Sequence, residues 1–585
     1  MTILFRTTYK RTLTSLLQRY ARAANSGMRL EAWLFDDLEN RRAAEAELAA
    51  HGVTARLHSA YKPLLHFFLE DLVLKDSGIT GVTVLYPQCA GAPENRFLLE
   101  TYPLAALVDD VPLSFAPGRQ EECVYDIIFT HGQGEKSTRQ VFAPNRSHQD
   151  GAGTLLSSTG WLRVHDAGGA LLLDERLETD FETLFTETLH RVAAHPWGDK
   201  EPYFEELNIR VDLPGRDFPL EFGRESISLH EALHEDLYFS LLEFFQIRAG
   251  RPPGDRGLQP GQIVPEIHHH DGDPGVTIEL RSFDRREITG PEQDLASAGH
   301  PLTCAQIHRE LEKIKGTPFT ALSRAGRNIE GRYHAGGDFA VMISGGQHAN
   351  ETSGIVGALR AAGILAAARE SHFTVAPLEN PDGYALHQRL IVANPDHMHH
   401  AARYTALGDD LGHRRGDLYE RRIRTQAQQL SRAELHVNLH GYPSHEWTRP
   451  LSGYVPRGFA LWTLPKGFFL IMNYHGAWRE RAEIFITGVT AKLAALPGLQ
   501  PFTHRQMELY HLHAATSAFR IIGGFPCLLT EDNEQEIPLS LTTEYPDETL
   551  HGAAFIAGHE AQTATVLAAY DTYQELRRAA MGGKP

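Results

Sequence analysis

The segment from residue 338 to residue 370 limits the fold of this chain more than any other part of it. It begins with an uninterrupted apolar run that ends in two glycines, "DFAVMISGG", which predicts a strand buried on both faces. The run that follows, "ETSGIVGALRAAGILAAARE", carries apolar residues on one helical face, at positions 355, 358, 359, 362 and 365. A buried strand followed at once by an amphipathic helix is typical of an α/β sheet.

The same alternation continues to the end of the chain. A Thr start, helical apolar spacing and a Gly stop predict a helix over "TCAQIHRELEKIKG", and residues 549–581 predict a closing helix that stops at two glycines. Further strands are expected in "HFTVAPLENPDG", "ELHVNLHG", "FFLIMNYHG" and "GFPCLLTED". Residues 297–585 are therefore expected to form one α/β domain, with a mixed, mostly parallel sheet flanked by helices.

The N-terminal region, residues 1–296, is expected to be a mixed α/β accessory part of one or two subdomains. Residues 30–75 predict strand, helix and strand, and "GWLRVHDAGGALLLD" and "GVTIELRSF" predict more strands. Residues 249–263 are rich in Gly and Pro and predict a loop. The sequence becomes polar and turn-like between about 285 and 300, which places the boundary there, and a chain of 585 residues is too long for one ordinary core.

Composition excludes several classes of protein. The net charge of −18 argues against a nucleic-acid-binding protein, which needs a basic surface. No apolar window is long enough for a membrane span, and the basic N-terminus has no apolar core of a signal peptide. The four cysteines are scattered without a CxxC pair, which favours a reducing compartment. We expect a cytoplasmic protein without nucleic-acid or membrane partners; an organelle transit segment is the alternative for the basic N-terminus.

Polar side chains stand where several of the predicted strands end. His348 and Glu351 are spaced H-x-x-E directly after the first strand, and His440 ends "ELHVNLHG". Glu531 ends "PCLLTE". About four H-x-x-acid pairs are expected by chance in a chain of this composition, so the spacing needs this context. Ligands bind at the carboxyl ends of strands in open α/β sheets, and catalytic zinc takes three protein ligands, so these residues predict a zinc site.

The C-terminal half resembles the M14 metallocarboxypeptidases over roughly residues 300–580. Besides the H-x-x-E pair, the resemblance rests on "GRNIEGR" (326–332), on "NPDG" (380–383) with Arg389 shortly after, and on His440 in "NLHGY". It also rests on Tyr510, which stands 21 residues before Glu531 in the sequence. The resemblance implies a phosphorylase/hydrolase-like α/β fold and the release of a C-terminal residue from a peptide.

The resemblance also implies a role for each of these residues. One zinc ion per chain would be held by His348, Glu351 and His440. Glu531 would be the general base, Arg389 would stabilise the oxyanion, and Tyr510 would be a mobile substrate-binding tyrosine. Asp410 corresponds to the carboxylate that supports a zinc histidine from behind. The N-terminal region would restrict the cleft, as accessory domains of large metallocarboxypeptidases do.

The sequence departs from the family at the substrate-carboxylate clamp. The family's Asp-x-Asn-Arg frame here reads Asp410-Leu411-Gly412-His413, followed by two arginines. His413 and Arg414 are therefore the candidates for substrate contact, and Arg415 is the alternative to Arg414 if the frame is shifted. The alternative is a zinc amidase, deacylase or endopeptidase that does not require a free C-terminal carboxylate, so the expected substrate is a peptide or an N-acyl amino acid.

Two other readings stay open. His230 and His234 form an H-E-x-x-H motif with Glu231, typical of zincin proteases, although Glu235 follows directly and no third ligand is evident. The histidine runs at 268–270 and 397–400 are expected to be solvated loop residues, with Arg403 and Tyr404 close enough to line the cleft. A non-enzymatic binding module with a decayed hydrolase fold is the last alternative, but the three metal ligands and Glu531 are all present.

Overall fold

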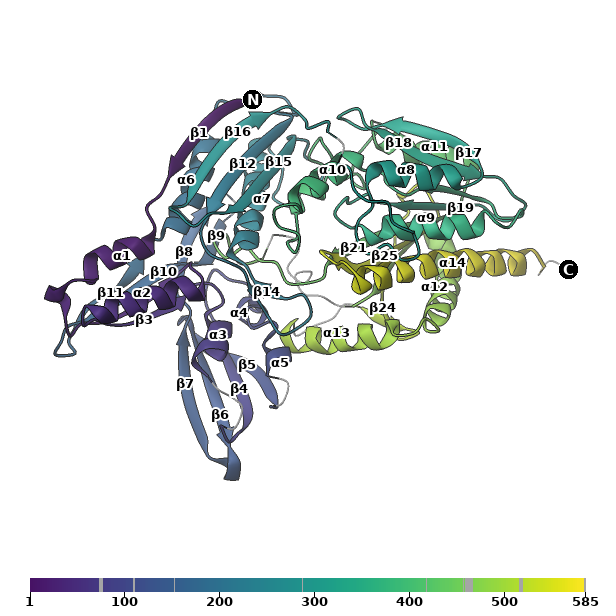
Figure 1. Ribbon diagram of the computed structural model, residues 1–585. Helices are drawn as coiled ribbons and strands as arrows, with labels where there is room; N and C mark the ends of the chain where they lie inside the picture. The colour runs from purple at the N-terminus through teal and green to yellow at the C-terminus, as the bar shows by residue number, and fades with distance from the viewer. Residues whose placement is uncertain are drawn as a thin grey trace.

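The computed structural model describes residues 1–72, 77–108, 111–151, 153–286, 288–416, 418–455, 457, 467–514 and 519–582. The chain forms a C-terminal part built on one large sheet and an N-terminal part built on several smaller sheets, which lie side by side in Figure 1.

The large sheet has nine strands and a mixed direction. Its order across the sheet is β17 (Thr317–Leu322), β18 (Asn328–His334), β20 (Phe373–Ala376), β19 (Val341–Gly345), β21 (Leu435–Pro443), β25 (Leu539–Glu548), β22 (Phe469–Tyr474), β24 (Phe525–Glu531) and β23 (Arg520–Ile522). The mixed α/β class is confirmed. The four central strands, β20, β19, β21 and β25, are parallel, whereas β22 and β24 run parallel to each other and antiparallel to β25.

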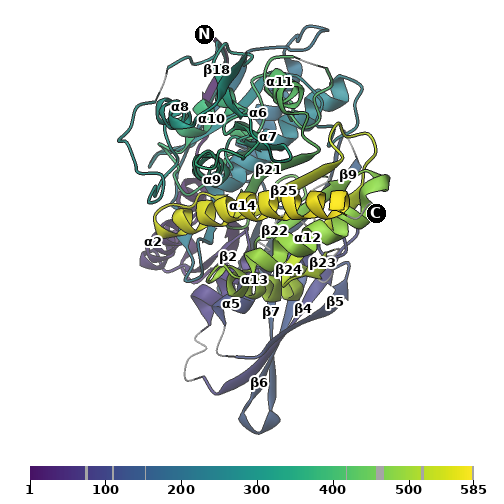
Figure 2. The same cartoon turned by 90° about the vertical axis from the view of Figure 1, so that its right-hand side faces the viewer.

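Helices cover both faces of this sheet, which explains the continuous apolar run of β19. Val341 and Ile343 pack into a core with α9 (Ser353–Leu365), α12 (Arg479–Leu493) and α14 (Ala553–Gly582). Met342, between them, packs with α11 (Arg421–Ser431) on the other face, because successive side chains of a strand point to opposite sides. Figure 2 shows α14 running across the sheet, with α12 and α9 on either side of it.

Further helical segments lie in the C-terminal part, including the short 3-10 turn η5 (Gly476–Trp478). α8 (Cys304–Lys313) begins at the predicted position, where Thr303 caps its first turn by accepting a hydrogen bond from the backbone N–H of Gln306. The others are α10 (Pro381–Leu390), α13 (Leu499–Ala514) and the short 3-10 turn η4 (His400–Ala402).

The N-terminal part confirms the predicted strand–helix–strand order, with β2 (Arg29–Leu34), α2 (Leu38–Ala50) and β3 (Thr54–Ser59). The last strand ends earlier than expected, because Pro63 starts the helical turn α3 (Pro63–His66). β2 and β3 continue the sheet of β10 (Gly160–His165) and β11 (Leu171–Leu177).

Two more four-stranded sheets lie in this part. One has the order β1 (Thr2–Thr8), β16 (Gly275–Arg281), β12 (Glu206–Leu213) and β15 (Gln262–His269), and α6 (Asp180–Ala194) and α7 (Leu229–Arg248) pack on it. The other has the order β5 (Leu113–Gln120), β4 (Ile79–Gln88), β6 (Val124–His131) and β7 (Lys136–Phe142), and it projects away from the rest in Figure 1.

Helix α7 forms the seam between the two parts. The N-terminal core includes side chains from beyond residue 380, among them Tyr404, Trp447 and Leu451. The C-terminal core begins at Ala298. No helix among the described residues is long and apolar enough to cross a membrane.

Candidate metal centre

His348, Glu351 and His440 come together at the carboxyl end of the central strands. β19 ends in Gly345, and Gly346 turns the chain in a left-handed conformation (φ +60°), where a Cβ would lie 2.9 Å from Leu378. This tight turn brings His348 and Glu351 in front of α9. His440 lies on the neighbouring strand β21, parallel to β19, and so reaches the same edge.

The ligand atoms of the three side chains converge on one point. The Nδ1 atoms of His348 and His440 are 3.0 Å apart, and they lie 2.8 and 2.9 Å from the two carboxylate oxygens of Glu351. Bonds of about 2.0–2.2 Å to one ion place ligand atoms roughly 3–3.5 Å apart, so the spacing fits a shared divalent cation. Within the described residues, this is the one group of three or more such side chains close enough to hold a metal.

Asp410 lies behind His348, as expected from the sequence. Its Oδ2 is 3.3 Å from Nε2 of His348, and its Oδ1 accepts hydrogen bonds from Gln347 and from the backbone N–H of Gly412. Burial opposes ionisation, but His348 and Arg403 outweigh it and hold the pKa of Asp410 well below its usual range. A fixed negative charge at Nε2 orients the ring and leaves Nδ1 facing Glu351 and His440.

Glu548 and Arg403 adjoin the group; the sequence analysis gave Glu548 no role and expected Arg403 only to line the cleft. Glu548 ends β25, its Oε2 accepts a 2.7 Å hydrogen bond from Asn350, and its Oε1 has no hydrogen-bond partner. Arg403 donates to Glu351 at 2.6 Å and lies 3.8 Å from Glu548. Burial, and then the negative charge of Glu351, raise the pKa of Glu548 well above its usual value. The alternating run "LSLTTEYPDE", which ends in this glutamate, was the signal available in the sequence.

Glu531 lies at the opposite end of the sheet, which corrects its assignment as general base. It pairs with Tyr474, Tyr474 with Leu539, and Leu539 with Leu435, five positions before His440 on β21. At about 3.3 Å per residue, this is roughly 17 Å along the strand. Glu531 is exposed and bound by Arg479 at 2.5 Å and by Asn533 at 3.1 Å. The expectation failed because β24 runs antiparallel to β21.

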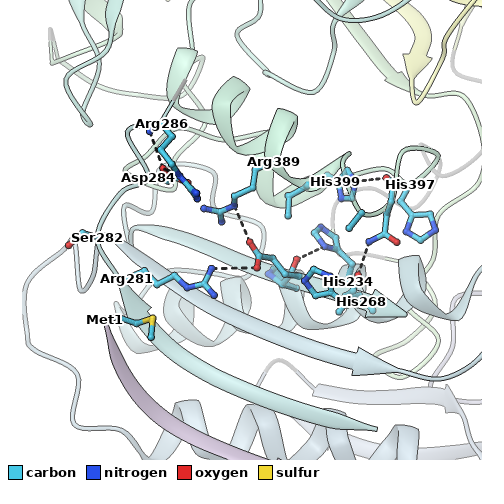
Figure 3. A pocket seen from close by; sticks show the side chains of 16 residues that line it. Met1, His234, His268, Arg281, Ser282, Asp284, Arg286, Arg389, His397 and His399 are labelled. Atoms are coloured by element: carbon cyan, nitrogen blue, oxygen red, sulfur yellow. Dashed lines mark hydrogen bonds and ion pairs between the residues drawn. The ribbon is translucent and has the colours of Figure 1, made fainter. Parts of the chain in front are cut away.

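Arg389 also lies away from the candidate metal-binding group, which consists of His348, Glu351 and His440. Its guanidinium binds Glu206 at 2.8 and 3.1 Å and Glu266 at 3.0 Å, both from the N-terminal part. Figure 3 shows it pointing into a cavity of about 530 Å³ at the seam, with Arg281 and Asp284 nearby. Its charge is engaged in joining the two parts of the molecule, so the oxyanion role expected for Arg389 is not supported.

Two other predicted substrate residues, Tyr510 and Arg414, are buried in contacts that do not fit the roles expected for them. Tyr510 is buried on α13 (1% exposed) among Leu99, Tyr102 and Tyr454, which does not suit a mobile tyrosine. Arg414 is buried and bound by Asp409 and Glu420.

The clamp position itself carries no side chain, because residue 412 is an exposed glycine. A Cβ on Gly412 would lie 2.8 Å from Nε2 of Gln347, so a side chain there requires that amide to move. His413 follows it and is exposed. A clamp made of residues 412 and 413, as in the family frame, is therefore absent.

The H-E-x-x-H motif on α7 is used in packing. His230 bonds the carbonyl of Leu213 at 3.2 Å, and His234 bonds the carbonyl of Pro265 at 3.0 Å. Glu231, the would-be base, bonds His445 at 2.6 Å. Burial lowers the pKa of His234 to about 4. These contacts point the two imidazoles at carbonyl groups, and the zincin alternative is not supported.

The second histidine run is buried, which corrects the expectation of a solvated loop. His397 bonds Asp217 at 2.5 Å, and His400 bonds Glu235 of α7 at 2.5 Å. His399 is also buried, whereas His269 and His270 of the first run are exposed. Residues 397–404 thus run between α7 and the metal-binding group, which is how Arg403 reaches Glu351.

Helix α7 and residues 444–455, which follow β21, cover this end of the sheet. Phe239 stacks on Trp447 with ring centroids 5.8 Å apart. Asp236 accepts a 2.8 Å hydrogen bond from the backbone N–H of Leu451 and a second from the hydroxyl of Ser452. Complete burial raises the pKa of Asp236 to about 7. The N-terminal part therefore packs over the end of the sheet that holds the candidate metal centre.

Comparison with known proteins found likeness only among solved structures. No family model and no curated protein matches the sequence. A metallo-carboxypeptidase from Burkholderia cenocepacia aligns with 52% of this chain and 76% of its own, at 15% identity and a TM-score of 0.29. Carboxypeptidase A from Helicoverpa armigera aligns with 59% of this chain and 95% of its own, at 11% identity and a TM-score of 0.28.

A third structure is an aspartoacylase family protein from Mesorhizobium loti, which aligns with 43% of this chain and 67% of its own, at 13% identity and a TM-score of 0.23. All three TM-scores lie below 0.5, so the likeness supports no activity. The chemistry is inferred from the metal-binding group and its neighbours.

Proposed function

We propose that this protein is a zinc-dependent hydrolase that cleaves an amide bond. The observation that carries the proposal is the convergence of Nδ1 of His348, Nδ1 of His440 and the carboxylate of Glu351 within hydrogen-bonding distance of one another. Two imidazoles and one carboxylate, with a further carboxylate behind one ring, are the protein ligands typical of catalytic zinc.

Zinc bound by these residues would supply Lewis acidity toward the scissile carbonyl and toward water. Glu548 would take the proton from the attacking water and pass it to the leaving amine. Burial suits it to this role because it makes the carboxylate more basic. Arg403 would stabilise the negative charge that develops near Glu548, and Asn350 would hold the carboxylate in place.

Two substrate classes remain candidates. The first is a peptide with a free C-terminal residue, as the family resemblance implies. The second is an amide or N-acyl amino acid whose recognition does not depend on that carboxylate. The second is favoured by one observation, because Gly412 supplies no clamp side chain and Arg414 is already bound to Asp409 and Glu420.

The test is hydrolysis by zinc-loaded protein of matched peptide acids, peptide amides and N-acyl amino acids. We expect zinc close to one per chain and turnover that Glu548→Gln nearly abolishes while zinc is retained. Glu531→Gln is the matched control and should act like the wild type. Cleavage of the acid but not the amide would select the exopeptidase. Full activity of Glu548→Gln would refute the mechanism.

A further inference from the structure

Two cysteines of the N-terminal part lie side by side although they are 34 residues apart in the sequence. The sulfur atoms of Cys89 and Cys123 are 3.3 Å apart, and both side chains are half-buried. Cys89 follows β4 and Cys123 precedes β6, and these strands pair antiparallel. A disulfide bond needs about 2.05 Å between sulfurs, so the thiols have to approach by a little more than 1 Å.

The backbone at both cysteines is already held by neighbouring strands. The N–H of Glu121 donates to the carbonyl of Gln88 at 3.0 Å, and the N–H of Ala143 donates to the carbonyl of Cys123 at 2.8 Å. The approach can therefore come from side-chain rotation, without breaking these hydrogen bonds.

We propose that Cys89 and Cys123 are a redox-active pair that forms an internal disulfide by exchange with a low-molecular-weight disulfide. The Cys89 thiolate attacks one sulfur of that disulfide, which releases one small thiolate and leaves a mixed disulfide on Cys89. The Cys123 thiolate then attacks the Cys89 sulfur and releases the second small thiolate. The protein loses two protons and two electrons, and the external disulfide is reduced to two thiols.

The surroundings assign Cys89 as the attacking thiol. Its hydrogen bond with Cys123, and more weakly the positive Arg96, lower the pKa of Cys89, whereas the same hydrogen bond and burial raise the pKa of Cys123. The thiol with the lower pKa is the better thiolate donor. Cys123 is then the resolving thiol.

The bond would close a loop that joins the two parts of the molecule. Within residues 90–122, Thr101 bonds His513 of α13 at 2.8 Å, Tyr102 bonds Glu225 at 2.7 Å, and Arg96 lies 5.1 Å from the ring of Tyr454. Fixing both ends of this loop restricts its opening, because a cross-link removes conformations from the open state. The inference is independent of the proposed hydrolase activity.

The test uses the full chain equilibrated with oxidised and reduced glutathione, followed by alkylation in denaturant and peptide mass mapping without reduction. We expect a Cys89–Cys123 cross-linked peptide, two hydrogens lighter than its reduced parts, with Cys304 and Cys527 still alkylated as internal controls. Cleavage of residues 90–122 by a protease should slow several-fold and recover on reduction.

Cys123→Ser provides the matched variant, since it should accumulate glutathione on Cys89 that the wild type releases. The proposal is overturned if the wild type keeps both thiols under oxidising conditions. It is equally overturned if the wild type carries glutathione on either cysteine without forming the cross-link.

Discussion

The two ends of the nine-stranded sheet hold similar residues in opposite settings. At one end, His440 lies in the last part of β21 and Glu548 ends β25, and these two side chains are 4% and 1% exposed. At the other end, Glu531 closes β24 on the surface, where it pairs with Arg479. A carboxylate at the end of a strand joins a site only when the direction of that strand brings it to the same edge.

The different settings shift the pKa values of the two carboxylates in opposite directions. Burial and the charge of Glu351 raise the pKa of Glu548, whereas hydrogen bonds from Asn533 and Arg479 lower the pKa of Glu531. The buried end therefore favours a group that accepts a proton, and the exposed end holds an ordinary surface ion pair.

Removal of a candidate metal ligand at the buried end of the sheet should have the largest effect on activity. We expect His348→Ala to lose bound zinc and all measurable hydrolysis, because the ion would keep only two protein ligands. Zinc per chain, measured by mass spectrometry, and turnover are the two readouts. His504→Ala, at an exposed position of α13, is the control, and wild-type zinc content in His348→Ala would contradict the assignment.

The direct comparison of the two glutamates comes next. Glu548→Gln should lower kcat by about 10³-fold with zinc retained, because loss of a general base costs roughly 10²–10⁴-fold. Glu531→Gln should stay within about twofold of the wild type, since exposed ion pairs contribute little. If the two variants exchanged these results, the end of the sheet that we assign to catalysis would be the wrong one.

A smaller effect is expected from a change at Asp410, which lies behind His348. Asp410→Asn should weaken zinc affinity by about 10–100-fold, because the amide orients the His348 ring less firmly than the carboxylate. Competition with a chelator measures this affinity. Asp532→Asn, next to Glu531 at the exposed end, should leave it unchanged, and an equal loss in both variants would argue against a supporting role for Asp410.

The smallest effect concerns Asp236 on α7, which covers the buried end of the sheet. It should appear as a pH dependence of stability. The pKa of Asp236 is raised from 3.8 to about 7 in the folded chain. Between these values the folded state keeps a proton that the unfolded state has released, so rising pH favours unfolding. Relative to Asp236→Asn, the wild type should lose stability from about pH 4 to pH 7, with no further relative change above pH 7.

Thermal unfolding of the wild type and of Asp236→Asn across this pH range measures the difference in their stability. Asp532→Asn, at the other end of the sheet, is the control. Only the change with pH of the stability difference between the wild type and Asp236→Asn is informative. The substitution also alters the hydrogen bonds to Leu451 and Ser452, which adds a contribution to this difference that does not depend on pH. A difference that does not vary with pH would mean that Asp236 is not buried as an acid in solution.

The sequence by itself predicted His348, Glu351 and His440 as candidate metal ligands, and it predicted the two strands, β19 and β21, near whose ends they lie. His348 and Glu351 are three residues apart, after a run whose apolar character demands burial on both faces, and His440 ends a similar run. These are local features, because hydrophobic periodicity and turn residues specify an element without reference to its neighbours. The strand–helix–strand order of β2, α2 and β3 followed from the same signals.

Only the tertiary structure decided which other side chains join the ligands. The alternating β25 inserts beside β21 and presents Glu548, whereas the apolar β24 runs the other way and carries Glu531 to the far edge. The burial of residues 397–404 under α7 places Arg403 at Glu351. Strand direction and the seam depend on pairing between residues up to hundreds of positions apart, and no local pattern encodes that choice.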